Sequence, residues 1–206
     1  MFPAQLSPRQ ITLFKVVVFM AASLPFLRLA WAIYADALGA NPIEFITRNT
    51  GDWTLYLLCI TLAVTPLRRV SGWNWLLRLR RMLGLFTFFY ATLHFTTFLW
   101  FDHFFDLAEM WKDVIRRPFI AVGFAAFVLL IPLAVTSTNA MVKRLGGKRW
   151  IWLHRLIYVI ALLAILHYWW MKAGKNDLEQ PLIFGVIVLL LLGMRVVWSL
   201  RKPART

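Results

Sequence analysis

The sequence has a single cysteine, few acidic residues and no nucleotide-binding motif. Cys59 lies inside an apolar run, which excludes an intrachain disulfide and a metal site built from several cysteines. Only 9 residues are acidic, against 23 lysines and arginines. A P-loop and a glycine-rich dinucleotide fingerprint are both missing. If the chain handles electrons from a nicotinamide cofactor, another protein must supply them.

Apolar residues are abundant instead. They make up 61% of the 206 residues, which is too apolar for a soluble domain and indicates a membrane protein. On a soluble chain the net charge of +14 would suggest a nucleic acid partner. Here the basic residues lie between long apolar runs, so membrane topology explains them better and no nucleic acid is expected.

Six runs are long enough, or nearly so, to cross a bilayer, which takes about 20 mostly apolar residues. We therefore expect an all-α integral membrane protein with one transmembrane domain over residues 1–206. The second run is the shortest, and Pro66 is predicted to end it. The longest loop, 102–117, mixes aromatic residues with charges and predicts an amphipathic turn at the membrane interface. The predicted spans cover residues 11–33, 52–67, 82–101, 118–138, 150–171 and 181–200.

Charge predicts the orientation of these spans. The chain ends and the even-numbered loops carry fourteen lysines and arginines, whereas the odd-numbered loops carry six. The positive-inside rule then places both termini in the cytoplasm. All nine acidic residues fall on the opposite side, in agreement with this orientation.

Part of the chain repeats at a shift of 73 residues. The stretch RRMLGLFTFFYATLHF (80–95) then aligns with LHRLIYVIALLAILHY. His94 matches His167, and His154 falls opposite Arg81. The second and fourth runs also end alike, in LAVTP and LAVTS. The match is short, but it suggests two related helix pairs in which one histidine is duplicated and the other is single.

Histidines inside a bilayer are costly and therefore indicate function. Imidazole is an axial ligand of haem, so two neighbouring helices that each give one histidine could clamp a haem iron from both faces. His94 lies 13 residues past Arg81, and His167 lies 18 past Arg149. At about 1.5 Å per residue these depths are about 20 and 27 Å. We predict a haem held between the third and fifth spans by His94 and His167, in the outer half of the membrane. The alternative is a hydrogen-bonded histidine pair that links the helices.

His154 has several interpretations. It lies five residues past Arg149, near the cytoplasmic surface. It is about 20 Å from His167 along the helix, which is too far to share one iron. It could bind a second haem, although Arg81 stands where a histidine partner would be expected. It could also hold a quinone or flavin, or simply lie at the interface.

Three other polar residues lie in or near the spans. Arg28 sits at outer depth in the first span and could pair with a haem propionate. Arg195 is near the cytoplasmic end of the sixth span and is expected to extend to the surface. His103, in the loop 102–117, is interpreted as structural.

Four motifs carry a family resemblance. TLHF around His94, WLHRLIY around His154, LHYWW around His167 and RRPFI before the fourth span resemble the MsrQ (YedZ) family, over essentially the full chain. That family comprises the haem-binding membrane subunits of the periplasmic methionine sulfoxide reductase system. It belongs to the wider ferric-reductase-like transmembrane group, which includes the NADPH oxidases.

The resemblance implies b-type haem, with His94, His154 and His167 as the matching haem-associated histidines, and an FMN that no motif locates. It implies a bacterial inner membrane and electrons from the quinone pool or a cytosolic flavin reductase. The implied acceptor is a periplasmic molybdopterin-dependent subunit that reduces methionine sulfoxide in proteins. The wider group typically has two histidines on each haem helix, and Arg80 and Arg81 depart from that pattern.

Two other functions stay open at this point. One is a stand-alone haem protein that oxidises quinol or reduces metal without a partner. The other is a proton transporter in which histidines relay protons. Under the leading hypothesis sulfoxide reduction takes place in a partner subunit, so no residue of this chain is predicted to be catalytic.

Overall fold

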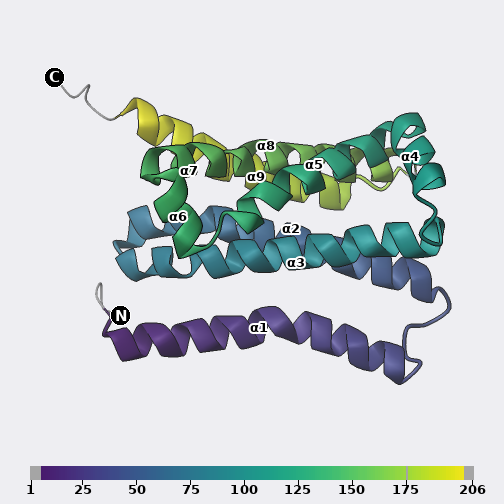
Figure 1. Cartoon of the computed structure of the whole chain (residues 1–206), viewed down its shortest axis with the longest axis horizontal. Helices are drawn as coiled ribbons and strands as arrows, with labels where there is room; N and C mark the ends of the chain where they lie inside the picture. Colours follow the sequence, from purple (N-terminus) through teal and green to yellow (C-terminus); the bar gives the residue numbers. More distant parts are fainter. Residues whose placement is uncertain (1–5, 175, 202–206) are drawn as a thin grey trace.

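The computed structural model describes residues 6–174 and 176–201, and the regular elements in these ranges are all helical. Figure 1 shows an elongated bundle in which α1 begins and α9 ends at the same end. The elements are α1 (Pro8–Tyr34), α2 (Pro42–Ser71), η1 (Asn74–Arg78), α3 (Arg80–Thr97), η2 (Phe98–Asp102), α4 (Leu107–Arg116), α5 (Pro118–Val135), α6 (Asn139–Leu145), α7 (Gly147–His154), α8 (Leu156–Ala173) and α9 (Glu179–Leu200).

Five of the described helical stretches are long and apolar enough to cross a membrane, so the chain is a multi-pass membrane protein by length and composition. The stretches are Pro8–Tyr34, Arg80–Asp102, Pro118–Val135, Gly147–Ala173 and Glu179–Leu200. α2 has 30 residues but is not among them. Charges near both of its ends leave only residues 53–67 uncharged. The sixth crossing, by α2, stays a prediction.

The bundle has two ends of different composition. We call the end with the α1–α2 loop, α4 and the α8–α9 loop the acidic end, because the acidic residues of the chain lie there or on the adjoining turns of the helices. The opposite end, where α1 begins and α9 ends, is the basic end (Figure 1). The predicted orientation makes the acidic end the outer one.

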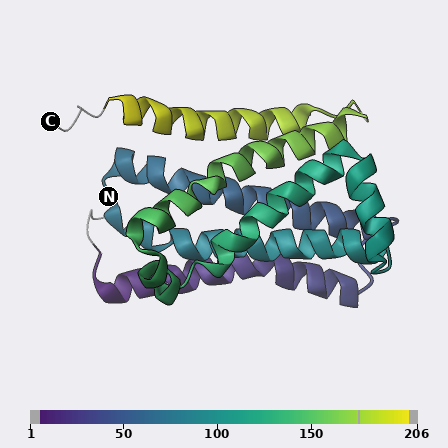
Figure 2. The ribbon, with the colours of Figure 1, turned by 45° about the horizontal axis from the view of Figure 1, so that its top comes forward.

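Two closely packed helix pairs form the centre of the bundle, α2 with α3 and α5 with α8. The pairs meet where Phe95 of α3 stacks on Phe127 of α5, with ring centroids 4.7 Å apart. α9 packs against α2 and α8. Figure 2 shows α5 and α8 running obliquely across α2 and α3. As a result α3 and α8 each pack on a partner helix more closely than on each other.

The prediction that Pro66 ends the second helix is wrong, because α2 continues through it to Ser71. Proline has no N–H, so the carbonyl oxygen of Leu62 loses its usual donor one turn earlier. The Arg195 guanidinium of α9 donates to that oxygen. The helix ends instead before Gly72, whose φ of 75° is the left-handed conformation that favours glycine.

Arg195 therefore does not extend to the surface as the sequence analysis expected. Its side chain turns into the bundle, where it also donates to the carbonyl oxygen of Leu191 and lies over the Tyr158 ring, 5.4 Å from the centroid. A cation in an apolar bundle needs such partners to offset its desolvation. The interaction ties α9 to α2 and α8.

The loop 102–117 contains the predicted amphipathic element, as the helix α4. Asp106 caps it by accepting from the N–H groups of Ala108 and Glu109, and these bonds hold the pKa of Asp106 below its usual value. Met110 and Val114 are buried against the bundle, whereas Leu107, Trp111 and Ile115 are exposed along another face.

The first helix is attached to the bundle through the buried hydroxyl of Tyr90. In a regular helix the N–H of Phe26 would donate to the carbonyl oxygen of Ala22. Here the N–H of Phe26 donates to Tyr90 Oη at 3.0 Å, and the hydroxyl donates to the Ala22 oxygen at 2.8 Å. Phe19 and Phe26 of α1 also pack edge-on against rings of α3. Tyr90 thus joins α1 to α3.

Replacement of Tyr90 by phenylalanine should lower the stability of the protein in detergent by about 0.5–2 kcal/mol, because two interhelical hydrogen bonds are lost. The midpoint of thermal unfolding, followed by tryptophan fluorescence, measures the effect. Tyr34→Phe removes the same hydroxyl from a side chain that is 83% exposed and serves as the control. Equal midpoints for the two variants would show that the hydrogen bonds of the Tyr90 hydroxyl contribute nothing to stability.

Candidate functional site

The structure brings the imidazoles of His94 and His167 together, as the sequence analysis predicted for their depths. The ring centroids lie 6.3 Å apart and the ring planes are inclined at 72°. Two imidazoles that bind one metal ion from opposite sides, through bonds of about 2 Å, have a separation of this size. The two side chains come from α3 and α8, one from each of the two closely packed helix pairs.

A backbone carbonyl fixes the protonation of each ring. Nδ1 of His94 lies 3.0 Å from the carbonyl oxygen of Thr47 in α2, and Nδ1 of His167 lies 2.7 Å from that of Phe119 in α5. A carbonyl can only accept, so Nδ1 carries the proton and donates it. Nε2 of each ring then keeps its lone pair, and the structure gives it no hydrogen-bond partner among the described residues. This is the tautomer that binds a metal through Nε2.

Glycines make room for both rings. A Cβ placed on Gly51 would lie 3.1 Å from Cε1 of His94, and one on Gly123 would lie 2.7 Å from Nδ1 of His167. Each glycine stands one helical turn after the carbonyl that accepts from the ring, Thr47 in one case and Phe119 in the other. The rings therefore rest directly on helix backbone, which fixes their position.

The same arrangement of three residues occurs twice. His94 with its carbonyl and glycine partners of α2 corresponds to His167 with those of α5, at a shift of 73 residues for the histidines and 72 for the other two positions. The sequence analysis found the histidine repeat but missed the glycines. An extension of the alignment from α3 and α8 back to α2 and α5 would have found Gly51 and Gly123.

His154 lies apart from this pair. It ends α7, and the turn at Arg155 separates it from α8, so His154 and His167 do not lie on one continuous helix. Its Nδ1 lies 3.1 Å from the carbonyl oxygen of Trp150, and its ring stacks on the Trp150 ring with centroids 3.9 Å apart. Nε2 faces Ser137 Oγ at 3.5 Å. No second histidine of the described residues faces it.

Neither Arg28 nor His103 contacts the histidine pair. Arg28 is exposed on α1 and has no hydrogen bond or ion pair to another described residue. His103 is packed edge-on against Phe98, and its Nε2 lies 3.4 Å from Asp113 Oδ2. The arrangement of His103 fits its interpretation as a structural residue.

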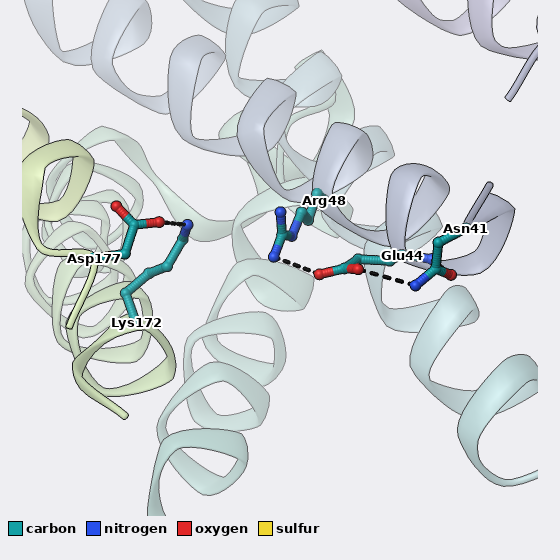
Figure 3. A network of polar contacts seen from close by, with 5 residues as sticks. All are labelled: Asn41, Glu44, Arg48, Lys172 and Asp177. Atoms are coloured by element: carbon teal, nitrogen blue, oxygen red, sulfur yellow. Dashed lines mark hydrogen bonds and ion pairs between the residues drawn. The ribbon is translucent and has the colours of Figure 1, made fainter. Parts of the chain in front are cut away.

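Charged residues of α2, of the end of α8 and of the α8–α9 loop lie on the acidic side of the pair. Arg48 forms an ion pair with Glu44, which also accepts from the side-chain amide of Asn41. Lys172, which is 8% exposed, pairs with Asp177. Figure 3 shows these two groups near each other at this end of the bundle.

Two imidazoles alone make a poor site for a free metal ion. Among the described residues no group of three or more histidines, cysteines, aspartates or glutamates is placed to hold one. A planar macrocycle that supplies four ligands of its own needs only two axial imidazoles on opposite faces. The donor set of this site, two neutral Nε2 atoms in an apolar bundle, thus fits a haem.

Comparison with known proteins agrees with this chemistry. Residues 50–165 match the family described as "Ferric reductase like transmembrane component". Curated relatives cover nearly the whole chain and carry the name "Protein-methionine-sulfoxide reductase heme-binding subunit MsrQ".

One relative, from Herminiimonas arsenicoxydans, is 74% identical over 199 residues, which are 97% of this chain and 91% of the relative. Another, from Bordetella pertussis, is 55% identical over 98% of each chain. A third, from Rhodospirillum rubrum, is 50% identical over 91% of this chain and 89% of the relative. At these identities and lengths, the chain belongs to the MsrQ family of ferric-reductase-like transmembrane proteins.

Proposed function

We propose that this chain is the haem-binding membrane subunit of a methionine sulfoxide reductase and that it carries electrons across the membrane. The observation that carries the proposal is the pair of facing imidazoles, 6.3 Å apart, with both Nδ1 atoms committed to backbone carbonyls. The names of the relatives, which describe heme-binding subunits, support it.

His94 and His167 would hold a b-type haem between α3 and α8. The haem supplies a one-electron iron couple when bound. Two imidazole ligands would suit the haem to electron transfer and not to oxygen activation. The carbonyl oxygens of Thr47 and Phe119 orient the rings and increase the basicity of Nε2. The apolar helices keep water away from the pair.

The direction of transfer follows from the predicted orientation. The acidic end faces the periplasm of a bacterial inner membrane, and the histidine pair lies near this end, level with the second turn of α2 and the first turn of α5. The proposed acceptor is a periplasmic molybdopterin-dependent subunit that reduces methionine sulfoxide in proteins. The proposed donor is the quinone pool or a cytosolic flavin reductase. His154, near the basic end, lies on the donor side.

FMN stays a prediction, because no group of described residues identifies a site for it. A propionate contact by Arg28 also stays a prediction, since that side chain is exposed on α1. A proton relay through the histidines is disfavoured, because the Nδ1 protons of His94 and His167 are held by carbonyls that cannot pass them on.

The holoprotein should show a sharp Soret band and a reduced α-band, and both should disappear in His94→Ala and in His167→Ala, because each variant removes one axial ligand. His103→Ala removes a histidine outside the pair and is the control, with the spectrum retained. Absorption spectra of purified, detergent-solubilised protein test this. A folded wild-type protein without colour would end the haem hypothesis.

The two glycines predict a graded effect on the same spectrum. Gly123→Ala places a methyl group 2.7 Å from the His167 ring, and Gly51→Ala places one 3.1 Å from the His94 ring. Haem content per chain should therefore fall strongly in Gly123→Ala and less in Gly51→Ala. In Gly193→Ala, where a Cβ meets nothing within 4 Å, it should not change. Equal haem content in all three variants would contradict the role given to the ring–backbone contact.

His154→Ala separates the interpretations of that residue. Since His154 stacks on Trp150 and faces no second histidine, we expect haem content to stay unchanged and reduction by the donor to slow. A pyridine haemochrome assay with protein quantitation gives the haem content, and stopped-flow reduction gives the rate. Loss of half the haem would instead assign a second haem to His154.

A further inference from the structure

A polar groove follows one face of α2 at the acidic end of the bundle. Its volume is about 340 Å³. The polar residues that line it are Asn41, Glu44, Arg48, Asn49 and Asp52. Glu44, Arg48 and Asp52 are four residues apart along α2 and Asn49 follows Arg48, so these side chains lie on one side of the helix. The residues before Asp52 precede the predicted span 52–67, so this stretch of the groove opens beyond the apolar part of the helix.

Two hydrogen-bond acceptors in the groove lack a partner among the described residues. Oδ1 of Asn49 is buried and accepts no hydrogen bond. The Asp52 carboxylate forms no hydrogen bond or ion pair with another described residue, so it is available to a group from outside the chain. Lys172 and Arg48 are the cations close enough to interact electrostatically with Asp52. Each forms an ion pair with a different carboxylate, Lys172 with Asp177 and Arg48 with Glu44 (Figure 3).

An unpaired carboxylate beside a buried carbonyl oxygen is a site for a donor that carries positive charge. The charges at this end of the bundle also favour a positively charged ligand. The loops and helix ends on this side hold all nine acidic residues of the chain and six basic ones, so their balance is negative. A basic group is therefore attracted to this end of the bundle before it reaches the groove.

The groove adjoins the histidine pair through the helix backbone. Arg48 and Asn49 directly follow Thr47 in the sequence, and the Thr47 carbonyl oxygen is the one that accepts from His94. Gly51, on which the His94 ring rests, precedes Asp52. A group bound in the groove thus contacts the same turns of α2 that hold His94.

We propose that this groove is the docking site for a lysine or arginine side chain of the periplasmic redox partner, with Asp52 and Asn49 as its acceptors. The inference rests on the proposed function, because it needs a soluble acceptor on the acidic side. The inference adds the place where that acceptor binds and the kind of side chain with which it binds.

The test uses the holoprotein in nanodiscs and the purified periplasmic reductase subunit. The dependence of the haem reoxidation rate on partner concentration gives the apparent Kd. We expect Asp52→Asn to weaken binding by roughly threefold or more and Asp52→Lys by at least roughly tenfold, because a like charge then meets the partner's cation. Added salt should weaken wild-type binding and have less effect on Asp52→Lys.

Asp102→Lys makes the same change of charge at an exposed position of the acidic end that does not line the groove. It should change the apparent Kd by no more than about twofold, an effect limited to long-range attraction. Soret spectra equal to those of the wild type establish that each variant is folded. The isosteric Asp52→Asn keeps the test valid if Asp52→Lys does not fold.

Equal effects of Asp52→Lys and Asp102→Lys, or no effect of either Asp52 variant, would overturn the proposal. So would the release of bound phosphatidylethanolamine from Asp52→Lys nanodiscs at unchanged partner affinity, which would assign the groove to a lipid amine. A wild-type protein that passes no electrons to the partner would instead refute the proposed function.

Discussion

The candidate site depends on one repeated interaction, the hydrogen bond from a histidine Nδ1–H to the carbonyl oxygen of a neighbouring helix. The bond sets the tautomer, so the lone pair of Nε2 is directed away from the supporting helix. A glycine one turn further along the supporting helix lets each ring come close enough to the backbone to form this bond. In an apolar interior this bond has no competition from water, so it can hold the ring with little freedom.

The packing of the bundle follows from this arrangement. Each histidine helix pairs closely with the helix that supplies its carbonyl, α3 with α2 and α8 with α5. Stacked phenylalanines join the two pairs at α3 and α5. A direct contact between α3 and α8 would close the space that a cofactor between the two rings requires, and these helices pack on their partners instead. The duplicated support thus explains both the symmetry and the spacing of the histidines.

The helical membrane fold and the histidine pair could be predicted from the sequence, because apolar runs and basic anchors reflect physical requirements of the bilayer. Apolar runs must be helical in a bilayer, and the depth of a histidine follows from its distance to a basic anchor, which is why His94 and His167 were paired. The contacts of Pro66 and Arg195 could not be predicted, since a carbonyl freed by proline in one helix is satisfied by a side chain 133 residues later. The same holds for Tyr90, whose hydroxyl replaces a bond inside α1.

The central claim is that both imidazoles bind one iron, and electron paramagnetic resonance of the oxidised protein tests it most directly. Two axial imidazoles make ferric haem low-spin, and ring planes inclined at 72° make the signal strongly anisotropic, because near-perpendicular ligands leave two iron orbitals close in energy. The account predicts this signal in the wild type. A high-spin ferric signal, as given by an iron with one protein ligand, would contradict it.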